Sequence, residues 1–302
     1  MRKKLENESL LIEIEDTGAE LVRIFDKEKQ REVLWSGDPT YWGRHAPLLF
    51  PNVGRHWQDQ YQVNGKSFPS KQHGFARDMA FTCIEHSKRQ VVHQLQSDEA
   101  TLEKYPFAFL LNVRHTLEGR RITVQWEVEN PAEGPMYFTI GGHPAFRVPV
   151  NEESYSDYQL HFPGESSLTY LLIDPDGNGT VDAEHPHTLL LDKASVPLGP
   201  LKDGEQVLSE HFFDLDALIF DDAQITEAQI LLPDGSEYVK LHCESFPCFG
   251  IWAAPDAPFV CLEPWMGRAD DKGFTGSLEQ KPNINRLEKR SVFTKSYQIE
   301  IC

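Results

Sequence analysis

Apolar and polar side chains alternate with a period of two along much of this 302-residue chain, and this alternation limits the folds open to it. In residues 121–128, RITVQWEV, every second side chain is apolar and the intervening ones are polar. The runs 107–117, FAFLLNVRHTL, and 291–301, SVFTKSYQIEI, repeat the pattern less regularly. Such alternation is typical of antiparallel strands that bury one face.

Turn signals separate these runs. A polar residue followed by glycine occurs at Asn64-Gly65, Glu118-Gly119, Asp176-Gly177 and Asp234-Gly235. The stretches YQVNGKSF (61–68) and ILLPDGSEYVKL (230–241) therefore predict β-hairpins. A helical pattern is convincing only in DEATLEKYP (98–106). The chain is predicted to be all-β, with many short strands in a large antiparallel sandwich.

Residues 163–206 interrupt the regular pattern with many Pro, Gly and Asp residues. This composition fits either a linker between domains or long loops within one sandwich. The short apolar runs LTYLLI (168–173) and TLLL (188–191) favour the loops. We therefore expect residues 1–302 to form a single β-sandwich domain.

The charge and composition of the chain limit the classes of binding partner that we expect. Lys and Arg number 29 against 47 Asp and Glu, which gives a net charge of −18. This balance repels nucleic acid and anionic lipid, so neither partner is expected. No run reaches the roughly 18 apolar residues of a membrane span, and the N-terminal MRKKLENESLLIEIED does not read as a signal peptide. Five cysteines without CxxC spacing predict reduced thiols and a cytoplasmic location.

Four short motifs place polar or charged residues at the ends of apolar runs. They are LFPNVGR (49–55), QHGFARDM (72–79), GGHPAF (141–146) and CLEPW (261–265). In GGHPAF, Pro144 favours an extended backbone at His143, and the two glycines allow close approach to the backbone. Glu263 follows mainly apolar residues, and an isolated carboxylate is costly to bury. A buried glutamate without a partner or a task is uncommon.

Each of these residues also has an ordinary structural interpretation. Arg55 fits a surface ion pair, and His73 fits a turn that its ring nitrogen caps. Arg77 and Asp78 could pair with each other or face solvent. His143 could be a packed turn residue. The spacing alone does not decide between these interpretations and a functional site.

The sequence predicts a site without metal or cofactor. His185 and His187, in EHPHT, lack a third ligand. His115 falls on the apolar face of its strand and is expected in the core. Cys243 and Cys248 have the wrong spacing for a zinc knuckle. The HExxH, GxSxG and phosphate-cradling glycine motifs are all missing from the sequence.

Taken together and in this order, the four motifs resemble those of the aldose 1-epimerase (galactose mutarotase) family, and most closely its bacterial LacX-type branch. The resemblance extends from about Tyr41 to the C-terminus. It implies a single large antiparallel β-supersandwich and an isomerase that interconverts the α and β anomers of a hexose. Carbohydrate is the implied partner. The sequence leaves open whether the protein is a monomer or a homodimer.

The resemblance also implies roles for individual residues. By motif, Glu263 corresponds to the catalytic base and His143 to the general acid. His73 corresponds to a second histidine near the sugar ring oxygen, and Arg55 to a ligand of sugar hydroxyls.

A hydroxyl-binding aspartate of the family best matches Asp216 in DLDALIF (214–220). Asp214 and Asp221 are close rivals for this position. Trp265 or Phe75 could stack on the sugar, although core packing is the expected role of Phe75.

Three alternative functions remain open. Arg55 and Arg77 could bind a phosphate, because guanidinium matches phosphate geometry. The related hexose-6-phosphate epimerases carry a stretch similar to HGFAR, so a phosphorylated substrate is the first alternative. A glycoside hydrolase would use a carboxylate pair such as Asp216 and Glu263. A sugar-binding protein without catalytic activity is the third.

Overall fold

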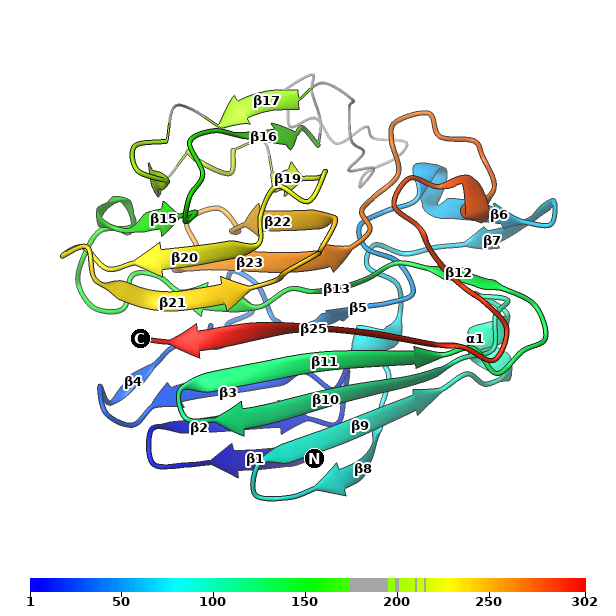
Figure 1. Cartoon of the computed structure of the whole chain (residues 1–302), viewed down its shortest axis with the longest axis horizontal. Coiled ribbons are helices and arrows are strands. Elements are labelled where there is room, and N and C mark those ends of the chain that lie inside the picture. Colours follow the sequence, from blue (N-terminus) through cyan, green and yellow to red (C-terminus); the bar gives the residue numbers. More distant parts are fainter. Residues whose placement is uncertain (174–194, 199–200, 210, 215) are drawn as a thin grey trace.

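The polypeptide folds almost entirely into β-strands that pair in antiparallel fashion (Figure 1). The structure is a computed structural model, and it describes residues 1–173, 195–198, 201–209, 211–214 and 216–302. The prediction of an all-β antiparallel fold is confirmed.

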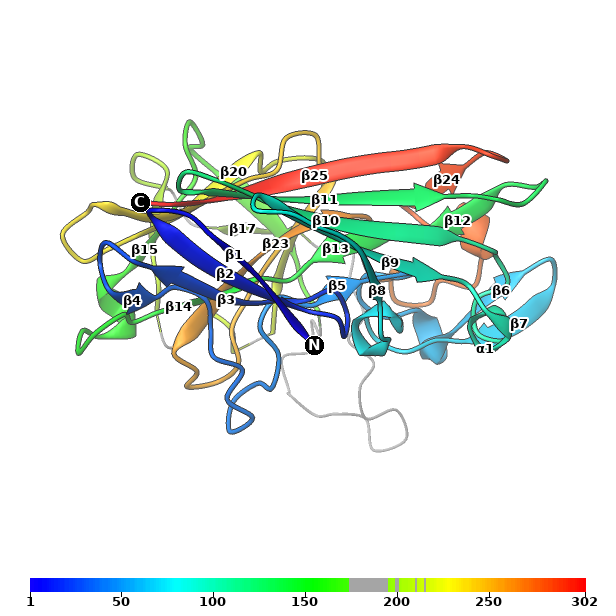
Figure 2. The same ribbon diagram turned by 90° about the horizontal axis from the view of Figure 1, so that it is seen from below.

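The largest sheet holds nine strands and runs through most of the molecule. Its order is β18 (Glu205–Val207), β15 (Gln159–His161), β20 (Glu227–Leu231), β21 (Glu237–His242), β25 (Val292–Ile301), β11 (Arg121–Glu129), β10 (Leu110–Glu118), β9 (Gln90–Gln96) and β8 (Thr82–His86). Figure 2 shows β25, β11 and β10 in one layer, with β13 and β5 of the second sheet in another.

The second sheet carries the motifs of interest. Its order is β17 (Ser195–Leu198), β16 (Leu168–Leu171), β19 (Leu218–Phe220), β22 (Cys248–Trp252), β23 (Phe259–Met266), β13 (Ile140–Gly142) and β5 (Leu48–Leu49), and β14 (Ala145–Arg147) also pairs with β23. Tyr297 of β25 packs against the backbone of Gly142 in β13. This contact joins the two sheets within the GGHPAF motif, at the residue before His143.

Smaller elements complete the described fold. A four-stranded sheet holds β1 (Arg2–Glu6), β2 (Leu10–Glu15), β3 (Leu21–Asp26) and β4 (Arg31–Glu32). Two further sheets have two strands each: β6 (Gln60–Val63) pairs with β7 (Lys66–Pro69), and β12 (Met136–Phe138) pairs with β24 (Asn285–Leu287). The helices are α1 (Glu99–Leu102) and the 3-10 turns η1 (Trp57–Asp59), η2 (Ala76–Asp78), η3 (Tyr155–Asp157) and η4 (Leu278–Gln280). None of the helices in the described part of the chain has both the length and the apolar character needed to cross a bilayer.

The alternating runs form strands because their apolar faces cover the core. In β11, Ile122, Val124, Trp126 and Val128 are each at most 3% exposed. The predicted hairpins β6–β7 and β20–β21 are confirmed, with Gly65 and Gly235 in the left-handed conformation.

Two predicted boundaries differ from the structure. The alternating run from Phe107 enters the sheet only at Leu110, because Phe107 instead packs its ring against Tyr105 and Tyr137. The predicted helix shortens to α1, which begins at the Asp98 cap and spans one turn.

The loop-rich segment 163–206 pairs with both large sheets where it is described. β16 pairs with β17 and β19, and β18 pairs with β15. The predicted Asp176-Gly177 turn, the histidines His185 and His187, and the run TLLL lie outside the described residues.

Candidate active site

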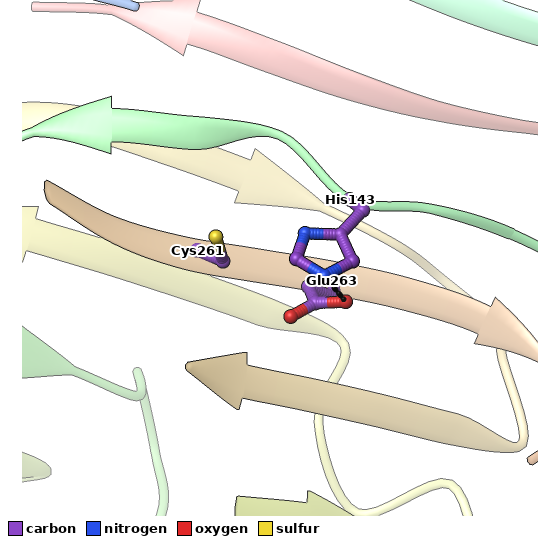
Figure 3. Close-up of side chains that lie close together, drawn as sticks. All are labelled: His143, Cys261 and Glu263. Atoms are coloured by element: carbon purple, nitrogen blue, oxygen red, sulfur yellow. Dashed lines mark ion pairs between the residues drawn. The ribbon is translucent and has the colours of Figure 1, made fainter. Parts of the chain in front are cut away.

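His143 and Glu263 meet because two strand pairings flank them in the same register. Gly141 of β13 pairs with Trp265 of β23, and Ala145 of β14 pairs with Cys261 of the same strand. His143 lies midway between the two pairings and faces Glu263. Its Nε2 atom is 3.2 Å from Glu263 Oε2 (Figure 3).

Burial controls the protonation of this pair. His143 is 6% exposed and Glu263 is 1% exposed. Burial raises the pKa of Glu263 well above its ordinary value, and the nearby Asp216 carboxylate raises this pKa further. Burial and the positive charge of Arg77 lower the pKa of His143 to about 3. Burial therefore favours the uncharged form of both groups, in which one proton is available to pass between the carboxyl group and the imidazole.

His73 adds a second buried imidazole. Its ring lies edge-on to that of His143, with centroids 5.6 Å apart. The Gly54 N–H donates to His73 Nδ1 over 3.1 Å, so His73 caps the Gly54 turn as one interpretation predicted. Burial and the neighbouring His143 and Arg77 hold the pKa of His73 well below its usual range. Because Nδ1 accepts a hydrogen bond, the neutral ring carries its proton on Nε2 and can donate it to a ligand.

Three arginines surround the two histidines. Arg77, Arg55 and Arg44 each lower the pKa of His73 through their positive charges. Arg55 Nη1 lies 2.7 Å from Asp59 Oδ1, which fits the predicted surface ion pair. Arg77 Nη2 donates to the Gln72 carbonyl over 2.9 Å, and burial lowers the pKa of Arg77 to about 10.

Asp78 has a partner that the sequence did not single out. Its carboxylate lies 2.7 Å from Arg44 Nη2, so it pairs with Arg44 and not with Arg77, and it stays exposed to solvent as one interpretation predicted. The Nε atoms of Arg55 and Arg77 are buried, and neither has a hydrogen-bond partner in the described part of the chain. The site thus gathers positive charge in a chain whose net charge is −18.

Of the three candidate aspartates, Asp216 acts on the pair formed by His143 and Glu263. Its charge raises the pKa of Glu263, and burial raises its own pKa. Asp214 faces the exposed His211 instead, at 3.1 Å from its Nδ1. Asp221 lies 3.5 Å from Arg268. Asp216 has a φ of 72°, which turns the chain before β19 begins.

The aromatic contacts differ from those predicted. Trp42, which no sequence pattern distinguishes, stacks on His143 with centroids 4.9 Å apart and planes at 28°. Trp252 approaches His143 edge-on at 5.7 Å. Trp265 is 3% exposed and packs in a core cluster with Leu49 and Val53. Phe75 packs against the main core, as expected.

A buried ionic cluster fixes the turn that carries Arg55. The Asp270 N–H donates to the Arg55 carbonyl over 2.9 Å. The Asp270 carboxylate accepts from the Trp57 N–H and contacts both His56 and Lys281. Asp270 thus joins the consecutive residues 55–57 to Lys281, and single-residue patterns do not reveal such a set.

One group of possible metal ligands lies within the site. His143, Cys261 and Glu263 each place a ligand atom within 4.8 Å of the others, and all three are buried. All five cysteines are free. As expected, His115 is a buried core histidine, 2% exposed.

Comparisons with known proteins agree with this geometry. The family model described as aldose 1-epimerase matches residues 1–285. The chromosomal Protein LacX of Lactococcus lactis subsp. lactis is 29% identical over 309 residues, which cover 100% of this chain and 99% of that protein.

Two solved structures share the fold along the whole chain. The galactose mutarotase related enzyme from Lactobacillus acidophilus has a TM-score of 0.90 and 28% identity, and the match covers 100% of this chain and 97% of the other. A galactose mutarotase-like protein from Lactobacillus casei ATCC 334 has the same TM-score and identity, with 100% of both chains covered. The fold is therefore the antiparallel β-supersandwich of galactose mutarotases. The chain belongs to the aldose 1-epimerase family.

Proposed function

We propose that this protein is an aldose 1-epimerase that interconverts the α and β anomers of a hexose. The observation that carries the proposal is the buried pair formed by His143 Nε2 and Glu263 Oε2 at 3.2 Å. An acid and a base in direct contact suit a reaction that moves one proton off a hydroxyl and another onto the ring oxygen.

The proposed reaction begins when the shared proton passes from Glu263 to His143. The Glu263 carboxylate then takes the proton of the C1 hydroxyl, while the His143 imidazolium protonates the ring oxygen. The bond between C1 and the ring oxygen breaks and leaves an open-chain aldehyde. At this stage Glu263 is protonated and His143 neutral, which are the forms that burial favours. Rotation about the C1–C2 bond and reversal of both transfers close the ring on the other face.

The surrounding residues would hold the sugar in place. The Nε2–H of His73 is suited to donate a hydrogen bond near the ring oxygen. Asp216 is suited to accept hydrogen bonds from sugar hydroxyl groups, and Arg55 is suited to donate them. Arg77 is a further hydrogen-bond donor. Positioning of this kind supplies part of the rate gain. Spontaneous mutarotation already proceeds in water, so the enzyme has no large barrier to overcome.

Polarimetry on fresh α-D-glucose and α-D-galactose tests the proposal. His143→Asn and Glu263→Gln are each expected to lower kcat/KM by about 10²–10⁴-fold. His86→Asn, at an exposed histidine of β8, is the matched control and is expected to keep the wild-type rate. A wild-type protein that does not accelerate mutarotation of any hexose contradicts the proposal.

A hexose-6-phosphate 1-epimerase is the second candidate function. It is favoured by the positive charges of Arg44, Arg55 and Arg77 around His73. Arginine binds phosphate through charge-assisted, paired hydrogen bonds. If the substrate is phosphorylated, the 6-phosphate is epimerised faster than the free hexose, and Arg77→Gln raises KM for the phosphosugar alone.

The remaining alternatives predict different results. A glycoside hydrolase would release the aglycone from aryl glycosides, and a sugar-binding protein would bind hexose without accelerating mutarotation.

We further propose that residues 1–302 act as one cytoplasmic domain. One core cluster joins residues from Leu5 to Ile301, and the five free thiols suit a reducing compartment.

A further inference from the structure

Cys261, which the proposed reaction does not use, lies on the same side of β23 as Glu263. The two residues are two positions apart, so the strand directs both side chains to one face. His143 approaches that face from the β13–β14 connection (Figure 3). Within the described residues, this trio is the one group of three or more His, Cys, Asp or Glu side chains close enough to share a metal ion.

The ligand types select a particular class of ion. Thiolate, imidazole and carboxylate together suit Zn²⁺ and Co²⁺, whereas Mg²⁺ and Ca²⁺ prefer oxygen ligands alone. Metal–ligand bonds of about 2.0–2.3 Å bring neighbouring ligand atoms of a tetrahedral site to roughly 3–4 Å from one another. The atoms here lie within 4.8 Å, so small side-chain rotations would close the site. Three protein ligands leave a fourth position for water or a sugar hydroxyl.

Unsatisfied polar atoms support the same site. His143 Nδ1 is buried and has no hydrogen-bond partner in the part of the chain that the structure describes. Glu263 Oε2 is also buried, and its contact with His143 Nε2 at 3.2 Å lacks the alignment of a hydrogen bond. Buried polar atoms of this kind normally have a partner, which can be a water, a ligand or an ion. The thiolate and the carboxylate would together balance the charge of a divalent ion.

We propose that Cys261, His143 and Glu263 form an inhibitory site for a thiophilic divalent ion such as Zn²⁺. Binding releases two protons to solvent, one from the Cys261 thiol and one that His143 and Glu263 share. An imidazole and a carboxylate bound to the ion can no longer exchange protons with a sugar. The inhibition rests on the proposed epimerase function, but the binding of the ion does not.

Co²⁺ titration of the whole protein tests the binding directly. A thiolate ligand gives Co²⁺ a charge-transfer absorption in the near ultraviolet, which we expect to saturate at one ion per chain and to be displaced by Zn²⁺. Cys261→Ser should abolish this absorption and weaken Co²⁺ affinity about 100-fold or more, since even indirect partners of a ligand contribute 10–100-fold. Cys248→Ser, at another buried free cysteine, is the matched control and should retain wild-type absorption and affinity.

The test does not depend on whether Cys261→Ser folds, because thermal unfolding checks its fold and a second variant can replace it. Cys261→Ala serves in place of Cys261→Ser if thermal unfolding shows that the serine variant is not folded. The absence of the absorption in the wild type, or affinity that survives removal of the Cys261 thiol, overturns the site.

Inhibition is measured separately, as the wild-type mutarotation rate with Zn²⁺ and after addition of EDTA. Reversible inhibition at the Zn²⁺ concentration that displaces Co²⁺ supports the full proposal. A full mutarotation rate with the ion bound overturns the inhibitory role. A protein that binds Co²⁺ through Cys261 but has no mutarotase activity overturns the proposed function and leaves the metal site intact.

Discussion

At the residue scale, the indole ring of Trp265 lies between two glycine backbones. A Cβ atom at Gly141 would stand 2.5 Å from Trp265 Cδ1, and one at Gly250 would stand 2.5 Å from Cη2 of the same ring. The two glycines before His143 thus leave room for aromatic rings to pack against the backbone. Trp265 packs against Gly141, and Tyr297 packs against Gly142. This packing fixes β13 against β23, and the alignment of His143 with Glu263 follows from it.

Gly141→Ala tests this packing. The added methyl group would overlap the indole of Trp265 in a filled core, and overpacking of this kind costs about 1–3 kcal/mol of unfolding free energy. Urea unfolding measures the change. Gly134→Ala, where an added Cβ has no neighbour within 4 Å, is the matched control. Equal stabilities of the two variants would show that Trp265 does not press on Gly141.

At the element scale, charged side chains hold separate strands and turns together. Arg120, in the turn between β10 and β11, reaches Asp26 at the end of β3 with its Nη2 2.6 Å from Oδ2. The same guanidinium donates from Nε to the Ile301 carbonyl over 2.7 Å. The two contacts join the N-terminal sheet to β25 and to the β10–β11 turn of the nine-stranded sheet.

The Asp26 contact predicts a pH dependence of stability. Asp26 is fully buried, and the Arg120 hydrogen bond and backbone N–H groups outweigh desolvation, so its pKa in the folded protein is lowered. A lowered carboxyl pKa adds stability above the unfolded value of about 4, and this stability is lost as the pH falls further. Urea unfolding from pH 6 to pH 3 is therefore expected to show a smaller decline for Asp26→Asn than for wild type. Glu103→Gln, at an exposed site, is the control, and an unchanged decline in Asp26→Asn would contradict the prediction.

The ionic cluster behind the Arg55 turn gives a second prediction at this scale. Lys281 and Asp270 are 3% and 2% exposed, so Lys281→Met leaves a buried carboxylate without its ammonium partner. A loss of about 3–5 kcal/mol in unfolding free energy is expected. Adding Asp270→Asn to Lys281→Met should restore part of that loss, because the unpaired charge is then removed. A double variant less stable than Lys281→Met would show that the cluster does not behave as an ion pair.

At the scale of the whole molecule, much of the architecture could be predicted from the sequence. β10, β11 and β25 follow from local alternation, because each buries a single face against the same core. The four motifs identified His143, Glu263 and their neighbours, although Glu263 lies inside β23 and not at the end of a strand.

Other parts of the site could not be predicted, because they depend on contacts between distant segments. Trp42 and Arg44 lie in an irregular stretch before β5, where no periodicity distinguishes them. They reach the site only because the second sheet brings the segment before β5 beside the β13–β14 connection. The Asp270 cluster likewise joins residues from 56 to 281 that no local pattern connects.

The central claim is that His143 and Glu263 act as one proton-transfer unit on the same sugar. The most direct test is the mutarotation rate of wild type, His143→Asn, Glu263→Gln and the double variant, with each protein shown to be folded. When two residues act as a unit, the loss of one already removes the function of the other. We predict that kcat/KM of the double variant equals that of the weaker single variant within about threefold. Losses that multiply in the double variant would show that the two side chains act independently and would contradict the account.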